Sequence, residues 1–195
     1  MINSGLVTDF PPEVLREAGS LTKTIARTGN GSVRDMREVL WSSIDNTESR
    51  DLDQVEYVER LPDGRLRLLI GIADVDVFVP KGSVIDRHAF ANTVSVYTPA
   101  IIFPMLPEQL STDKTSLLEG RDRLAVVIEL IVTREGVVLS KDVYRAAVRN
   151  HAKLTYGEVG EWLEGRSPAP GGVTNVVGLE EQIRLQLEAT ERLHA

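Results

Sequence analysis

Two pairs of strand-like runs, each joined by a tight turn, restrict this chain to folds that contain neighbouring antiparallel strands. The first pair joins residues 55–60 to residues 66–75 across a Pro-Asp-Gly turn at 62–64. The second pair joins residues 124–133 to residues 137–148 across a Glu-Gly turn. A hairpin needs a hydrophobic face to pack against something else, so the two pairs predict a sheet that helices cover.

Helices are expected on both sides of these strands. Proline at the start, a serine three residues before an aspartate, and apolar residues at helical spacing mark four of them. We expect helices at residues 11–18, from Ser83 onwards, at 155–163 and at 179–193, the last with Leu179, Ile183 and Leu187 on its apolar side. Residues 29–32, 99–107 and 167–172 are rich in Gly or Pro and are expected to be loops.

The organisation is that of one α/β domain of the α+β type, with a mixed, largely antiparallel sheet and flanking helices. Residues 1–38 are predicted to be a helical and loop entry segment, and a strand at residues 39–44 opens the main domain, which runs from 39 to 195. The last helix has no partner after it, so we expect the chain to be a fragment of a larger domain.

Composition narrows the functional classes. Cysteine is absent, which excludes a disulfide partner and thiolate metal sites, and no apolar run approaches the length of a membrane span. A cytoplasmic, soluble protein is therefore expected. The net charge of −7 has the wrong sign for a simple nucleic-acid coat, although an enzyme that gathers carboxylates around metal ions can be acidic overall.

An acidic cluster is the most informative local feature. Asp45, Asp51 and Asp53 fall within nine residues, directly after a hydrophobic run. Like charges so close repel one another, whereas a divalent cation between them turns repulsion into attraction. Oxygen ligands without nearby His or Cys favour Mg²⁺ or Mn²⁺, which can hold a phosphodiester for attack by water.

Two other interpretations of this cluster stay open. It could be a solvated acidic loop without a ligand. It could also be a calcium loop that begins at Asp45, but Arg50 stands where such a loop needs Gly, and strands flank it. The calcium alternative predicts a structural module without affinity for RNA.

The sequence Ser43-Ile44-Asp45, five residues, then Asp51-Leu52-Asp53 resembles the acidic signature of the ribonuclease II and ribonuclease R family, the RNB catalytic domain. The resemblance runs from residue 39 to residue 163. It continues in order through residues 72–75, 95–97 with Pro99, 103–107, 110–111, 116–117, 122–124 and 152–156. The chain therefore resembles the N-terminal part of that domain.

The resemblance implies a 3′-to-5′ exoribonuclease that hydrolyses single-stranded RNA to 5′-mononucleotides with two magnesium ions. Asp45, Asp51 and Asp53 match three of the family's four metal-site aspartates, and Asp53 is the one tied most closely to the chemical step. Gln54 stands at the fourth position. An amide offers an oxygen without charge, so one magnesium would bind more weakly, or manganese would serve better.

The resemblance also suggests RNA contacts. Tyr97 and Tyr156 match family aromatics near the RNA, although either could simply pack against its own element. Arg149 and Lys153, with Arg145, form a basic stretch that could touch phosphates or could be a solvated face.

Two further positions and two absences complete the comparison with the family. Asp74 could support the metal cluster or cap a turn, and Gly71 stands where relatives commonly carry His. The family's oligonucleotide-binding barrel and Arg-rich motif are not among these residues, so the 195 residues alone are expected to be an inactive monomer. The rival hypothesis is a catalytically weak or inactive RNA-binding relative that has lost turnover through Gln54.

Overall fold

A computed structural model of the chain describes residues 7–21 and 33–194, so the expected loop at 29–32 lies outside the described residues. In chain order the elements are α1 (Pro12–Ser20), β1 (Val33–Asp35), β2 (Trp41–Asp45), β3 (Gln54–Arg60), β4 (Leu66–Ala73), the 3-10 helix η2 (Val75–Val77), α2 (Val84–Asn92), β5 (Val96–Tyr97), β6 (Ile102–Phe103), the π-helical turn η3 (Leu110–Lys114), β7 (Asp122–Val132), β8 (Val138–Thr155), α3 (Tyr156–Leu163), α4 (Gly171–Thr174) and α5 (Leu179–His194). No helix in the described ranges is both long enough and apolar enough to cross a membrane.

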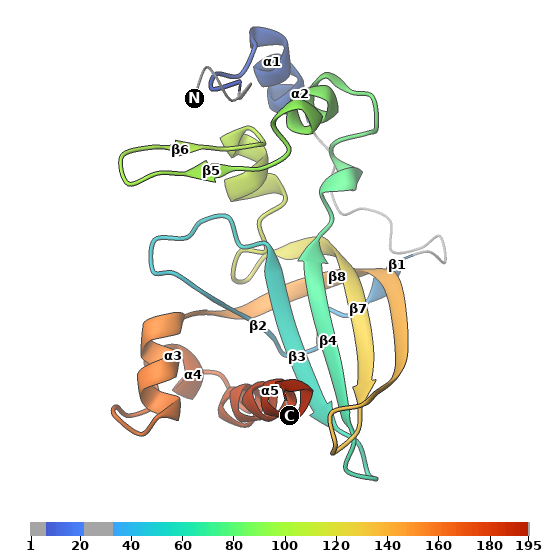
Figure 1. Ribbon diagram of the computed structural model, residues 1–195, viewed down its shortest axis with the longest axis vertical. Helices are drawn as coiled ribbons and strands as arrows, with labels where there is room; N and C mark the ends of the chain where they lie inside the picture. The colour runs from blue at the N-terminus through green and yellow to red at the C-terminus, as the bar shows by residue number, and fades with distance from the viewer. Residues whose placement is uncertain (1–6, 22–32, 195) are drawn as a thin grey trace.

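A six-stranded sheet with the order β1-β8-β2-β3-β4-β7 forms the centre of the molecule (Figure 1). The pairs β3–β4 and β7–β8 are antiparallel, as the two hairpins predicted; β4–β7 is also antiparallel, while β8 runs parallel to β1 and β2. The prediction of a mixed, largely antiparallel sheet with flanking helices is confirmed. Since β8 pairs with β7 along its first part and with β2 along its last, the sheet closes into a ring.

The interior of this ring is a hydrophobic core around the fully buried Trp41, Val55 and Leu69. Gly71 in β4 lies against this core, where a Cβ atom would come within 3.0 Å of Val55 Cγ2 and 3.6 Å of the Trp41 ring. The larger side chain that the family commonly has at this position would therefore need the neighbouring side chains to move.

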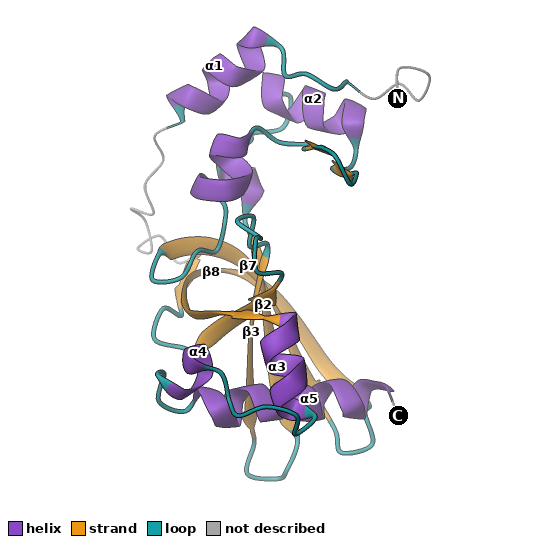
Figure 2. Cartoon of the chain, turned by 90° about the vertical axis from the view of Figure 1, so that its left-hand side faces the viewer, coloured by secondary structure: helices purple, strands orange, loops and turns teal. Residues whose placement is uncertain are grey.

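A separate group of helices sits at one end of the sheet (Figure 2). In it, α1, α2 and η3 pack around the buried residues Val14, Ala18 and Ile85. The predicted start of α2 is confirmed, because Ser83 Oγ accepts a hydrogen bond from the Asp86 amide at 3.1 Å.

Helix α5 covers part of the outer face of the sheet, and one residue that we expected on its apolar side is not there. Leu187 is 39% exposed, while Gln182 and Gln186 are buried. The side-chain oxygen of Gln182 accepts from the Val58 amide at 2.8 Å, and its amide group donates to the Val58 carbonyl. Strand β2 pairs with β3 only at Glu56, so these bonds satisfy backbone groups of β3 beyond the reach of β2, which explains why polar residues occupy buried positions of the helix.

The ends of several elements differ from the sequence-based expectation. Three residues of the expected entry segment form β1, which joins the sheet beside β8. Strand β8 continues to Thr155 because residues beyond Val148 find a new partner in β2. Two short elements, β6 and α4, also begin inside expected loops.

Candidate active site at the acidic loop

The acidic loop, defined here as residues 45–53, joins β2 to β3 at the end of the sheet nearest the β5–β6 hairpin (Figure 1). Asp45 is the last residue of β2 and lies beside Thr155 of β8 in the parallel ladder. Asp53 immediately precedes β3, and its carbonyl accepts from the Ala73 amide at 2.9 Å. The two ends of the loop are thus fixed by the sheet.

The middle of the acidic loop is held by the segment that precedes β7. Leu52 is buried and serves as the apolar anchor of the loop. Its amide donates to Ser116 Oγ at 2.9 Å, and the same hydroxyl donates to the Arg50 carbonyl at 2.8 Å. The Leu117 amide donates to the Leu52 carbonyl at 2.8 Å.

Lys153 of β8 holds the other side of the acidic loop. Its ammonium donates to the Thr47 carbonyl at 3.1 Å and to the Ser49 carbonyl at 2.6 Å. The lysine that we expected at an RNA phosphate is therefore engaged with the backbone that carries the three aspartates, and a phosphate contact stays a prediction.

The three carboxylates have different surroundings. Asp45 Oδ1 accepts from the Asn46 amide at 2.7 Å and from Ser49 Oγ at 2.8 Å. Asp51 Oδ2 accepts from the Tyr97 hydroxyl at 3.2 Å. Asp53 keeps an exposed side chain, yet partial burial and then the negative charges of Asp51 and Asp45 raise its pKa.

The acidic loop offers the ligand type that a hard divalent cation needs, but not the ligand spacing. The donors are carboxylate oxygens, the ligand type that such a cation prefers, and the charges of Asp51 and Asp45 act on Asp53. Within the described ranges, however, no group of three or more Asp, Glu or His side chains is close enough to hold a metal ion. The carboxylates would have to draw together to share one. Gln54 is exposed at the start of β3, next to Asp53.

Tyr97 brings an aromatic ring to the carboxylates. It lies in β5, which pairs with β6, and it is 65% exposed. Partial burial raises the pKa of its hydroxyl, and so do the charges of Asp51, Asp53 and Asp45. All three aspartates and this ring therefore lie in one region.

Of the remaining predicted RNA contacts, Tyr156 directly follows Thr155, the strand partner of Asp45, and the arginines are already paired. Tyr156 is the first residue of α3 and is 56% exposed. The Arg149 Nε atom donates to Asp122 Oδ1 at 2.7 Å. Arg145 pairs with the buried Asp74 at 2.9 Å, as well as with Asp76.

Of the two roles expected for Asp74, the structure supports the turn cap, because Asp74 directly precedes η2 and the Val77 backbone acts on its carboxyl; Asp74 also pairs with Arg145. Burial raises the pKa of this carboxyl, and the charge of Arg145 opposes that effect. The contact is an ion pair rather than an aligned hydrogen bond, because the Oδ2 atom that faces Arg145 has no hydrogen-bond partner.

The sequence did not reveal that Ser116 hydrogen-bonds to the acidic loop, and it predicted that Lys153 would contact RNA rather than this loop. The pair Ser116-Leu117 carried no chemical role in the sequence, because a serine before a leucine gives no local signal of a long-range hydrogen bond.

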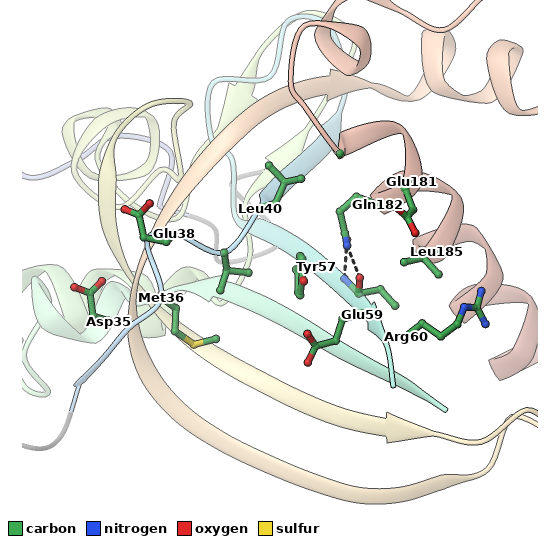
Figure 3. A pocket seen from close by; sticks show the side chains of 13 residues that line it. Asp35, Met36, Glu38, Leu40, Tyr57, Glu59, Arg60, Glu181, Gln182 and Leu185 are labelled. Carbon is green, nitrogen blue, oxygen red and sulfur yellow. Dashed lines mark hydrogen bonds between the residues drawn. The ribbon is translucent and has the colours of Figure 1, made fainter. Parts of the chain in front are cut away.

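A cavity lined by Glu38, Tyr57, Glu59, Glu181 and Gln182, among others, was also not foreseen (Figure 3). It lies at the opposite end of β3 from the acidic loop and includes none of the loop's residues.

Comparisons with known proteins identify a family model and a curated relative that match most of the chain. Residues 33–195 match the family model described as the RNB domain. Ribonuclease R of Thermotoga maritima is 35% identical over 182 residues, which cover 90% of this chain and 26% of that protein.

Solved structures of Mycoplasma genitalium RNase R resemble the whole chain. The complex with ribose methylated single-stranded RNA superposes with a TM-score of 0.88 at 27% identity, covering 100% of this chain and 30% of that one. The complex with double-stranded RNA gives 0.85 at 28% identity, covering 99% and 33%. The chain spans about a quarter of the length of the curated relative and about a third of the solved chains. This chain belongs to the RNB domain family, whose relatives named here are ribonucleases.

Proposed function

We propose that this chain forms part of a 3′-to-5′ exoribonuclease that hydrolyses single-stranded RNA to 5′-mononucleotides with two magnesium ions. The observation that carries the proposal is the hydrogen bond from the Tyr97 hydroxyl to Asp51, which places a ring suited to stacking on a base beside three carboxylates. A nuclease that acts at an RNA end needs both groups in one place.

The chain's own residues have separate tasks in this proposal. Asp45, Asp51 and Asp53 would hold the metal ions, with Gln54 adding a neutral oxygen. When bound, the ions would supply charge to the phosphate oxygens and lower the pKa of water. Asp53 matches the family aspartate that is tied most closely to the chemical step, so its replacement should do the most damage. Tyr97 would orient the terminal nucleotide by stacking.

A gel time course tests the proposal. The full-length gene product that carries this chain is incubated with 5′-labelled single-stranded RNA in Mg²⁺, in Mn²⁺ or in chelator, beside Asp53→Asn. Stepwise shortening that requires metal and Asp53 is expected. Intact RNA under every metal condition would overturn the proposal.

Gln54 supports a second candidate, a catalytically weak or inactive RNA-binding relative. The fourth carboxylate of the family is replaced by an exposed amide, which removes one negative charge from the set that would attract a second ion. RNA that is bound but not cut in the same assay would favour this candidate. The proposal also has the protein act as a monomer in the cytoplasm.

A further inference from the structure

The second half of the acidic loop, residues 50–53, depends on contacts outside the loop. The first half is held locally: the Ser49 amide donates to the Asn46 carbonyl at 3.2 Å, and Asp45 Oδ1 accepts from the Asn46 amide and the Ser49 hydroxyl. The Arg50 carbonyl and both backbone groups of Leu52 bond to residues 116 and 117, and the Thr47 and Ser49 carbonyls bond to Lys153. The positions of Asp51 and Asp53 are therefore set mainly by groups that hold the loop from outside.

Lys153 grips the loop through hydrogen bonds to its backbone. Its two acceptors are carbonyls, at 3.1 and 2.6 Å, and its own amide donates to Glu119 Oε2 at 2.8 Å.

Ser116 grips the loop from the opposite side and is itself held in place. It is completely buried, so it cannot touch RNA. Its hydroxyl is both acceptor and donor to the loop backbone, while its carbonyl accepts from Arg123 Nε at 2.9 Å. A buried hydroxyl with both roles filled gives the loop backbone one fixed position.

We infer that Lys153 and Ser116 are positioning residues that together hold the acidic loop in the form that presents its aspartates to metal. This inference rests on the proposed function. It also gives Lys153 a task other than binding RNA phosphate. Groups that orient metal ligands typically change metal affinity or activity by about 10- to 100-fold when they are removed.

Three variants separate the alternatives. Lys153→Met keeps the length of the side chain and removes its donors. Ser116→Ala removes the buried hydroxyl. Lys141→Met is the matched control, because Lys141 is an exposed lysine of the same strand whose side chain makes no hydrogen bond or ion pair in the described part of the chain.

The first measurement is hydrogen–deuterium exchange of residues 46–53 without metal. We expect faster exchange in Lys153→Met and Ser116→Ala, by about 5-fold at the Leu52 amide of the serine variant, because a lost hydrogen bond of this kind contributes about 1 kcal/mol. Exchange unchanged from wild type in both variants would overturn the inference. This readout needs no catalysis, so it remains decisive if the full-length protein does not cut RNA.

The second measurement compares metal and RNA dependence. In the positioning role, both variants raise the Mg²⁺ concentration for half-maximal cleavage by at least about 10-fold. The salt dependence of metal-free RNA binding then stays unchanged. A phosphate contact by Lys153 would instead reduce the slope of log affinity against log salt by about one in Lys153→Met. That result, with normal metal dependence, would contradict the inference.

Discussion

Replacing Gln182 of α5 should destabilise the chain more than replacing the larger apolar residue Leu187. Gln182 is buried and satisfies both the amide and the carbonyl of Val58, which is itself fully buried. Each buried backbone group left without a partner costs about 1–3 kcal/mol. Gln182 also lines a cavity that could admit water (Figure 3), so we expect Gln182→Ala to lower the free energy of unfolding by about 2–4 kcal/mol.

Leu187→Ala is the control variant, because it truncates an apolar residue of the same helix. Leu187 is already 39% exposed, so its truncation should cost about 1 kcal/mol. Urea unfolding is followed by the fluorescence of Trp41 and Trp162, both of which are buried. Gln182→Glu keeps an acceptor for the Val58 amide and should fall between the two. A larger loss for Leu187→Ala than for Gln182→Ala would refute the role assigned to the glutamine.

Three further predictions concern the acidic loop. Because the pKa of Asp53 is raised, the folded, metal-free chain binds a proton on this carboxyl more tightly than the unfolded chain does. The free energy of unfolding therefore falls as the pH rises from 3.8, the ordinary pKa of the carboxyl, through its raised pKa in the folded chain. Asp53→Asn should unfold at higher urea concentration than wild type at neutral pH but not well below pH 3.8, and a pH-independent difference would contradict this account. Tyr97→Phe should bind single-stranded RNA as wild type does in fluorescence anisotropy, whereas Tyr97→Ala should lose about 1–3 kcal/mol of binding free energy; equal losses in both variants would show that the hydroxyl, not the ring, makes the contact. Gln54→Asp should lower the Mg²⁺ concentration for half-maximal cleavage in a metal titration, and an unchanged value would mean that position 54 holds no ion.

The sheet was predictable because its hairpins are local. Gly64 and Gly136, with φ of 84° and 78°, lie in the two turns that the sequence marked, and the strands beside them pair as expected. The parallel pairing of β8 with β1 and β2 was not predictable in the same way. It joins segments about 110 residues apart, and no turn sequence specifies such a contact.

The sequence could predict which carboxylates form the candidate site, but not which residues hold the acidic loop in place. Asp45, Asp51 and Asp53 are close in sequence, so their proximity in space follows from chain length alone. The contacts of Ser116 and Lys153 with the loop span 64 to 106 positions and depend on how the whole sheet closes. The two glutamines of α5 were missed for a related reason, since helical periodicity identifies apolar faces and does not register a polar side chain that pairs with a strand.

The most direct test of the account is the identity of the first product released from single-stranded RNA labelled at its 3′-terminal nucleotide. The full-length gene product that carries this chain is mixed with this RNA and Mg²⁺, and products are separated after short times. The account predicts that the label appears at once as a nucleoside 5′-monophosphate, and that Asp53→Asn or a chelator abolishes its release. Labelled fragments of several nucleotides, or release that does not depend on Asp53, would contradict it.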